Sequence, residues 1–240
     1  MTIAEAHTEF RQAGDRLDSS SIPDMLVEQV DYFLNEASNR FVKTRYSGNN
    51  EFKMGFEEIQ KRTEDLKTLV FTEFPAITTV TTETNVFKAN LSSLFTDEAL
   101  TTPSTKEYWF YIRGRARVVK SGCTSTYVSI MLYQHDDLDD VMLDPFKRPI
   151  IDEVVGYFES GNLYIITSSG TTIDKVKLSY IKKPITVKYG TQYPTPSADV
   201  SFDLPEHTHK EIIQLAVIIA LENIEAKRLE TAMALKQTIE

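Results

Sequence analysis

One stretch near the C-terminus limits what this chain can fold into more than any other. In EIIQLAVIIALENIE, residues 211–225, apolar side chains cover nearly the whole circumference of a helix. A helix that is apolar all round must be buried on all sides. The apolar run has about ten residues, well short of the about 20 needed to span a bilayer. The residues that define it are Ile212, Ile213, Leu215, Ala216, Val217, Ile218, Ile219 and Leu221.

Helices from the N-terminal part of the chain are the simplest cover for this segment. Thr2 and Glu5 form a capping-box pattern, which predicts a helix that continues to about residue 17. A second helix should begin near Pro23, since proline suits a first turn, and run to residue 46 on a stripe of apolar residues spaced by three and four. A third should cover residues 55–66. A helix that is apolar all round needs more cover than three short helices provide, so a partner is also expected to cover it. The candidate contacts are Ile212, Ile213, Leu215, Ile218 and Ile219.

The middle of the chain is typical of sheet. EYWFYIRGRARVVK and TSTYVSIMLYQ flank Ser121 and Gly122 and predict a hairpin. VVGYF, NLYIIT and IDKVKLSYI are separated by ESG and SSGTT, which predicts an antiparallel meander. We therefore expect an α+β fold. A helical bundle forms from residues 1–70 and 203–240, and an antiparallel β domain, residues 71–202, is inserted into it.

Composition excludes several classes of protein. The 240 residues carry a formal net charge of −9, and affinity for nucleic acid comes mainly from Lys and Arg. A single cysteine, Cys123, excludes an internal disulfide and a cysteine-rich zinc site. The first residues have neither the basic nor the apolar region of a secretion signal. We expect a protein of the cytoplasm, or of a particle assembled there, with no membrane partner.

An aspartate-rich run, QHDDLDDVMLDPFKRP, is the first candidate site. It contains Asp136, Asp137, Asp139, Asp140 and Asp144. The spacing fails the calcium-loop pattern, because Leu138, Val141 and Lys147 occupy the third, sixth and twelfth positions. A metal-dependent enzyme that uses this cluster with His135 stays open as an alternative. The favoured interpretation is a short surface helix, capped by Asp136 or Asp137, with an apolar side of Leu138, Val141, Met142 and Leu143.

Arg113, Arg115 and Arg117 alternate along RGRARVVK and would share one face of a strand. They could contact DNA phosphates, or they could pair with carboxylates of a neighbouring subunit. The acidity of the chain favours carboxylates. The aspartate run is then a candidate partner, in the same chain or in the next one.

Other motifs point to no catalytic chemistry. The sequence contains no G-x-G-x-x-G, no P-loop and no G-x-S-x-G pattern. His207 and His209 stand two apart at a helix start, whereas two metal ligands on one helical face would be four apart. We expect no cofactor, no metal and no enzyme activity.

Several segments together resemble a known family. EFRQAGDRLDS, VDYFLNEASNRFVKTRYSG, GFEEIQKRTEDLKTLV, LDPFKRP, VVGYFESGNLYI, LSYIKKP and LPEHTHKEIIQLAVIIALENIE resemble the head-to-tail connector (ring or adaptor) proteins of tailed bacteriophages, most of all those of crAss-like phages.

The resemblance implies a structural protein of the virion. Copies of it, typically twelve, would form a ring of the neck below the portal and extend the channel through which the genome leaves. The implied partners are further copies, the portal protein and other neck or tail ring proteins, with DNA only as the passing genome.

Overall fold

The structure, a computed structural model, describes residues 1–17, 25–47, 59–81, 83–91, 107–120, 124–194 and 196–223. The chain divides into two compact units. One contains residues 1–69 and 184–240 and is helical, and the other contains residues 70–183 and holds a sheet. Each unit is described by itself.

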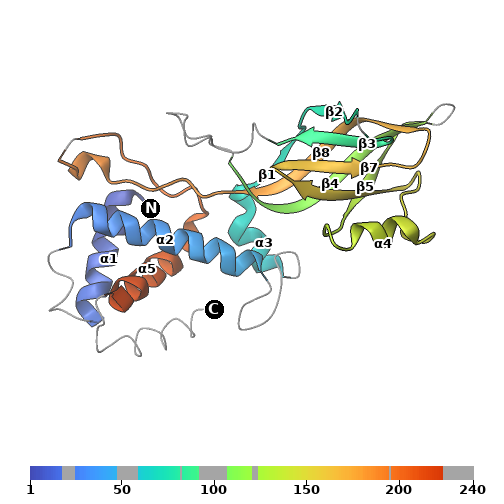
Figure 1. Cartoon of the computed structure of the whole chain (residues 1–240). Coiled ribbons are helices and arrows are strands. Elements are labelled where there is room, and N and C mark those ends of the chain that lie inside the picture. The colour runs from blue at the N-terminus through green and yellow to red at the C-terminus, as the bar shows by residue number, and fades with distance from the viewer. Residues whose placement is uncertain are drawn as a thin grey trace. The chain divides into compact units, whose positions relative to one another are not determined.

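The described part of the helical unit contains four α-helices, whose arrangement is shown in Figure 1. They are α1 (Ile3–Leu17), α2 (Val27–Tyr46), α3 (Gln60–Leu66) and α5 (His209–Asn223). Short 3-10 turns cover Lys67–Leu69, Gly190–Gln192 and Glu206–Thr208. Helix α5 packs against both α1 and α2, and α2 also contacts α3. The bundle predicted from residues 1–70 and 203–240 stays a prediction, since residues 224–240 lie outside the described part.

Local signals explain where these helices begin. The N–H of Thr2 donates to Glu5 Oε2 at 2.8 Å, and the N–H of Glu5 donates to Thr2 Oγ1 at 3.3 Å, so the capping box is confirmed. The N–H of Leu26 donates to Gln29 Oε1 at 3.0 Å, and α2 begins at Val27. The start expected near Pro23 lies outside the described residues, as does the part of the third helix before Ile59. Ile59 itself is extended, so α3 begins at Gln60.

The segment that leads into α5, residues 184–202, belongs with the helical unit, whereas the sequence predicts it as part of the β domain. Asn35 on α2 accepts from the N–H of Val187 at 2.8 Å and donates to its carbonyl at 3.0 Å. The N–H of Tyr189 donates to Asp31 Oδ2 at 3.0 Å. These hydrogen bonds join Val187 and Tyr189 to α2. Local strand propensity could not predict this contact, because the bonded residues are about 150 positions apart in the sequence.

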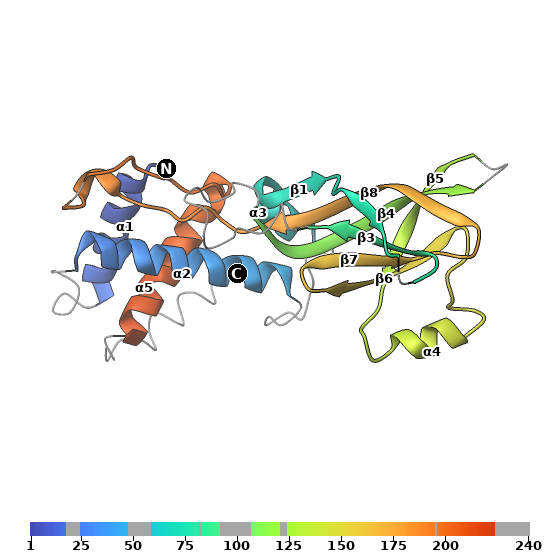
Figure 2. The same ribbon diagram turned by 45° about the horizontal axis from the view of Figure 1, so that its top comes forward.

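The second unit contains one sheet of eight strands in the order β1-β8-β4-β5-β6-β7-β3-β2. The strands are β1 (Val70–Glu73), β2 (Ile77–Thr79), β3 (Val86–Asn90), β4 (Tyr108–Lys120), β5 (Thr126–Leu132), β6 (Glu153–Glu159), β7 (Asn162–Ile166) and β8 (Thr171–Lys182). The two edge strands, β1 and β2, are joined by residues 74–76 alone. The sheet must therefore curl until its edges approach (Figure 2). Strand β2 does contact β8.

The α+β class is confirmed, but the prediction of a purely antiparallel sheet is wrong. Strands β5 and β6 are parallel, with Ser129 opposite Glu153 and Leu132 opposite Gly156. Parallel neighbours need a crossover connection, usually with a helix. Here the connection carries α4 (Leu138–Leu143), which is the short helix expected from the aspartate run.

The two predicted antiparallel pairs are confirmed, and only the last step of the predicted meander is wrong. β4 pairs with β5, and β6 pairs with β7, antiparallel in both cases. The β6–β7 turn has positive φ at Ser160 and Gly161, 48° and 71°, as a two-residue hairpin turn requires. The meander is wrong at its last step, because β7 pairs with β3 and β8 pairs with β4 and β1.

The curled sheet has a filled inner side. Its main core gathers buried residues from β3 to β8, among them Ala116, Ile130, Leu163, Val176 and Tyr180. A smaller cluster forms on the other side from Val86, Val155, Tyr157 and Ile166, and Val141 of α4 covers it. Helix α4 therefore caps part of the outer face of the sheet.

Candidate assembly surfaces

Alternation along β4 separates two sets of side chains. Gly114, Ala116 and Val118 are buried toward the core, and Arg113, Arg115 and Arg117 lie on the opposite, outer face. The three arginines thus share one face, as their spacing predicts. The strand register settles which face this is, because Ala116 pairs with Val128 and Val176, which both belong to the core.

Strand β8 adds lysines to this row. Arg113 stands opposite Ser179, Arg115 opposite Lys177, and Arg117 opposite Lys175. Both lysines are exposed. We call this outer surface of β4 and β8 the basic face; its residues are Arg113, Arg115, Arg117, Lys175 and Lys177. The sequence alone does not show the lysines as neighbours of the arginines, because the pairing of β4 with β8 joins strands about sixty residues apart in the chain. The alternation of KVKLSY was the available signal.

Two acids lie on or beside the basic face. Asp174 accepts from Arg117 Nε at 2.8 Å and also from its Nη2. The Arg117 hydrogen bond lowers the pKa of Asp174, and the same bond raises the pKa of Arg117. Glu153 shares the outer side through its register with Ser129. Lys177 forms no ion pair within the described part of the chain.

The other two arginines are held in place without a carboxylate. Arg115 Nη2 donates to the carbonyl of Tyr127 at 3.1 Å, and its guanidinium lies 5.9 Å from the centroid of the Tyr127 ring. Its Nε is buried and has no hydrogen-bond partner. Arg113 Nη2 lies 3.4 Å from Ser129 Oγ. The arginines are therefore oriented by β5 and keep donors for another acceptor.

The aspartate run forms a projecting segment. Asp136, Asp137, Asp139 and Asp140 are exposed, and Val141 is the buried residue of α4. The cap predicted at Asp136 or Asp137 is wrong: Asp137 precedes α4, but its side chain makes no capping bond. Its backbone is already helical, with φ −87° and ψ −12°, whereas a capping side chain normally extends from β-region backbone.

The apolar side predicted for this helix is only half present. Leu138 and Val141 pack on the outer cluster of the sheet, but Met142 is 39% exposed and Leu143 is 81% exposed. Phe146 is 94% exposed. A turn fixes it, since its N–H donates to Asp144 Oδ1 at 2.9 Å. We call residues 136–146 the acidic knob. It has exposed aspartates and three exposed apolar side chains, of which Leu143 and Phe146 are the most exposed.

The geometry of the acidic knob does not bring ligands together. Among the described residues, no three side chains of His, Cys, Asp or Glu converge in a way that could hold a metal ion. His135 Nε2 lies 2.9 Å from the carbonyl oxygen of Phe158, and its ring packs edge-on against Tyr157. No ion pair joins the four exposed aspartates to any described residue. Asp144 lies 3.9 Å from Lys147 Nζ.

The apolar helix expected from the sequence is buried in this chain. Ile212 is 0% exposed, Ile213 2%, Ile218 6% and Ile219 3%, and Leu215 is half-buried. Their role as contacts with a partner stays a prediction, and their burial favours a role in the core.

A buried carboxylate organises the helical unit. Asp31 accepts from the side chains of His7 at 2.8 Å and Tyr193 at 2.7 Å, and from the N–H of Tyr189. Burial alone would raise the pKa of Asp31, but these hydrogen bonds outweigh it and leave the pKa lowered. Burial, together with the bond to Asp31, raises the pKa of Tyr193 to about 12.

A second polar cluster joins three helices. Arg45 Nε lies 3.1 Å from Asp65 Oδ2, and Arg45 Nη2 donates to Glu211 Oε2 at 2.6 Å. His207 Nε2 lies 2.9 Å from Asp65 Oδ1, and His209 Nε2 lies 2.9 Å from the carbonyl oxygen of Leu204. The two histidines thus have separate structural partners, in line with a polar helix start.

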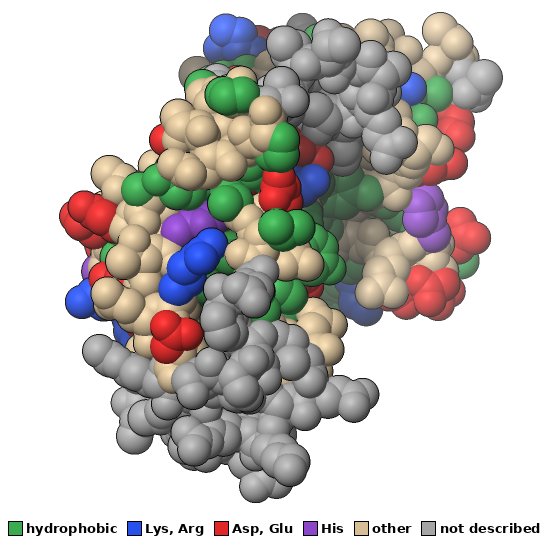
Figure 3. Space-filling view, turned by 90° about the vertical axis from the view of Figure 1, so that its left-hand side faces the viewer, with side chains coloured by type: hydrophobic (Ala, Val, Ile, Leu, Met, Phe, Trp, Pro, Cys, Tyr) green, Lys and Arg blue, Asp and Glu red, His purple; other side chains and the backbone are tan. Residues whose placement is uncertain are grey.

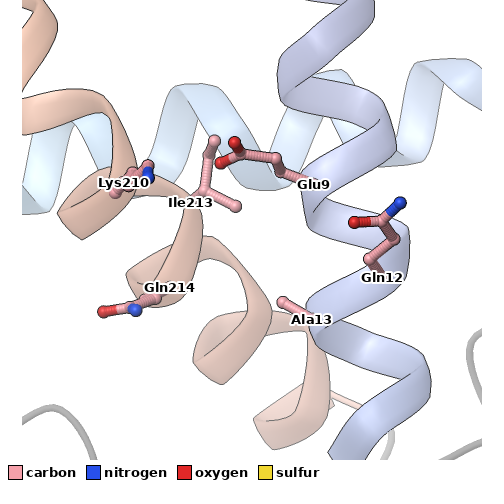
Figure 4. A pocket seen from close by; sticks show the side chains of 6 residues that line it. All are labelled: Glu9, Gln12, Ala13, Lys210, Ile213 and Gln214. Carbon is pink, nitrogen blue, oxygen red and sulfur yellow. The ribbon is translucent and has the colours of Figure 1, made fainter.

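A hollow of about 300 Å³ lies between α1 and α5 (Figure 4). Glu9 and Ile213 point toward one another across it. Gln12, Lys210 and Gln214 also line it, so its walls are mostly polar. This lining suits a hydrated groove better than an apolar ligand site. Around this unit, acidic and basic side chains are scattered over the face seen in Figure 3.

Comparison with known families decides what kind of protein carries these surfaces. The family model of phage tail ring protein 3/4 matches residues 1–232. The chain belongs to the phage tail ring protein 3/4 family. No curated protein matches it.

Membership of this family implies that the chain is a structural protein of the virion. It is a component of the virion tail, in a family that associates into rings and with other tail proteins and that is typically without enzyme activity. No helix in the described ranges has both the length and the apolar character needed to cross a membrane.

Proposed function

We propose that this ring protein belongs to the head-to-tail connector. It forms a ring of the neck below the portal, extends the genome channel, and joins head to tail. The family match over residues 1–232 supports the ring. The connector position is supported by the resemblance of the sequence segments to connector proteins.

The proposed partners are copies of the chain itself, twelve to a ring, the portal protein, and other neck or tail ring proteins. Two surfaces of the sheet unit support binding to other proteins. One is strongly basic, and the other is acidic and partly apolar. DNA enters only as the passing genome. The net charge of −9 would limit adhesion of DNA, because like charges repel at short range. Assembly takes place in the host cytoplasm.

Reconstitution tests the proposal. The full chain is mixed with the portal protein of the same phage, and mass is measured by light scattering while negative-stain images show the shape. We expect a ring seated on the portal. Rings that bind only to other tail proteins would contradict the connector position, and a chain that stays monomeric with every neck and tail protein would contradict the ring itself.

A further inference from the structure

The basic face has a feature that does not serve the folding of one chain. Arg115 stands opposite Lys177, and Arg117 opposite Lys175, in directly paired positions of β4 and β8. Like charges directly opposite on neighbouring strands destabilise a sheet. Asp174 neutralises Arg117 in part, whereas Lys177 and Arg115 form no ion pair with described residues. A surface of this kind is stabilised when an anionic partner covers it.

The acidic knob has the complementary composition. Its aspartates Asp136, Asp137, Asp139 and Asp140 are exposed and have no cationic partner among the described residues. Within the described part of the chain, no ion pair joins the knob to the basic face, so the charges of both surfaces can pair with those of another copy.

Apolar residues match as well. Leu143 and Phe146 project from the end of the knob. Beside the arginines, on the same outer side of β5, Tyr127 is 36% exposed and Met131 is 42% exposed. An exposed aromatic side chain whose backbone is already fixed by a turn is well suited to anchor an interface, because little backbone freedom is lost on binding.

We propose that the basic face binds the acidic knob of a second copy of this chain, with aspartates on the Arg and Lys side chains, and Leu143 and Phe146 against Tyr127 and Met131. Two different patches that recognise each other form a head-to-tail contact, which repeats from copy to copy and closes into a ring when the rotation allows. This inference rests on the proposed ring, and it names the surfaces through which neighbouring copies meet.

DNA is the competing occupant of a basic surface. The Asp174–Arg117 pair and the nearby Glu153 argue against it, since carboxylates within the face would repel phosphates. The mixture of exposed apolar and charged groups also fits a protein better than a phosphate backbone.

Charge reversal in the full chain tests the contact. One variant carries Arg115→Glu and Lys177→Glu, and the other carries Asp137→Lys and Asp140→Lys. Self-association is followed by sedimentation velocity at low salt. Each variant alone places like charges at the contact, so we expect association at least tenfold weaker than in the wild type. An equimolar mixture makes every contact complementary again, so we expect association to return.

Circular dichroism and thermal unfolding establish that each variant folds. If a Glu variant fails to fold, Arg115→Gln with Lys177→Gln replaces it and should weaken association without the rescue. Association that is unchanged in both reversed variants, or that the mixture does not restore, overturns the contact and leaves the ring proposal standing. Loss of duplex DNA binding in the first variant, with association unchanged, would assign the basic face to DNA.

Zero-length carbodiimide cross-linking of intact particles covers the case in which rings form only in the presence of other tail proteins. The reagent joins amines to carboxylates in direct contact. We expect mass spectrometry to find Lys175 or Lys177 joined to Asp136–Asp140, and we expect this product to be absent from dilute monomer. Lysines joined only to other virion proteins would overturn the inference, and absence of the chain from the particle would overturn the proposed function with it.

Discussion

Arg115 of β4 faces Lys177 of β8 across one rung of the sheet, on its outer side. Neither side chain has a carboxylate partner within the described residues. This pairing costs stability in the isolated chain, because like charges directly opposite repel. Reversing the charge at one of these positions should therefore stabilise the isolated chain and weaken its assembly.

Lys177→Glu should make the monomer more stable and the ring weaker. Glutamate opposite Arg115 converts a repulsive pair into an attractive one, which is worth about 0.5 kcal/mol in the free energy of unfolding. For a chain of this size, the melting temperature should rise by about 1–2 °C. Differential scanning calorimetry and sedimentation velocity on the same samples measure the two effects.

Lys177→Gln is the matched control, since it removes the charge without adding the opposite one. It should give about half the stabilisation. Lys210→Glu changes the net charge equally on the helical unit and should leave self-association as in the wild type. A monomer that loses stability with Lys177→Glu would show that the lysine has a stabilising partner instead.

Neutralising the knob should weaken assembly more than folding. In the variant with Asp136, Asp137, Asp139 and Asp140 changed to Asn, no ion pair to a described residue is lost. The first turn of α4 loses favourable charge, so the free energy of unfolding should fall by less than about 2 kcal/mol. Self-association should fall at least tenfold.

A control with Asp15→Asn and Glu28→Gln removes exposed acids from the helical unit and should not alter association. If the four-Asn chain unfolds at a much lower denaturant concentration than the wild type, the aspartates serve the fold of the sheet unit and not the contact.

The sequence predicts those parts of the fold that depend on neighbouring residues. The capping box of Thr2 and Glu5, the turn at Ser160 and Gly161, and the burial of the helix around Ile218 all follow from local patterns. The parallel pairing of β5 with β6 does not, because strand periodicity is the same for both directions. The pairing of β4 with β8 is also invisible locally, since it joins segments far apart in the sequence.

The basic face and the acidic knob could likewise be predicted from the sequence only where they depend on neighbouring residues. Alternation placed Arg113, Arg115 and Arg117 on one face, and the aspartate spacing excluded a calcium loop. The lysine row needed the β4–β8 register. The exposure of Leu143 and Phe146 needed the position of α4, because a helix of six residues packs only one side on the sheet. Val141 is buried and Leu138 is partly buried there, whereas Met142 and Leu143 stay in solvent.

Acid should destabilise the helical unit through Asp31. Its pKa in the fold lies below the ordinary value of 3.8. Such a carboxyl stabilises the fold above the unfolded pKa and loses this contribution as pH falls through the folded pKa. Asp31→Asn should lower the free energy of unfolding at pH 7 by about 2 kcal/mol and flatten its decline below pH 4. Denaturant unfolding at pH 7, 4, 3 and 2 measures both, and parallel curves for the variant and Asp15→Asn would contradict the assignment.

Alkali should act on the same cluster through Tyr193. Its pKa is about 12 in the fold against an ordinary value of 10.0. A group with a raised folded pKa contributes fully below the unfolded value, and the contribution is lost as pH rises toward the folded value. Melting temperatures should therefore fall between pH 10 and 12. Tyr193→Phe should show a smaller fall over this window. Tyr180, also with a pKa of about 12, contributes to the residual decline, so adding Tyr180→Phe should reduce it further. Tyr46 and Tyr157, whose pKa values burial also raises, contribute to the part that is left.

Gly156 on β6 should tolerate no side chain. A Cβ there would lie 2.5 Å from Ile130 Cγ2, on the strand that pairs in parallel with β6, and 3.3 Å from the carbonyl oxygen of Tyr164. Gly156→Ala should lower the free energy of unfolding by about 1–3 kcal/mol, the usual cost of overpacking a core. Ile130→Ala removes the clashing methyl group, so in that background the same glycine substitution should cost far less. A double-mutant cycle by urea unfolding gives the coupling, and strictly additive effects would show that β5 and β6 do not approach each other as closely as this register requires.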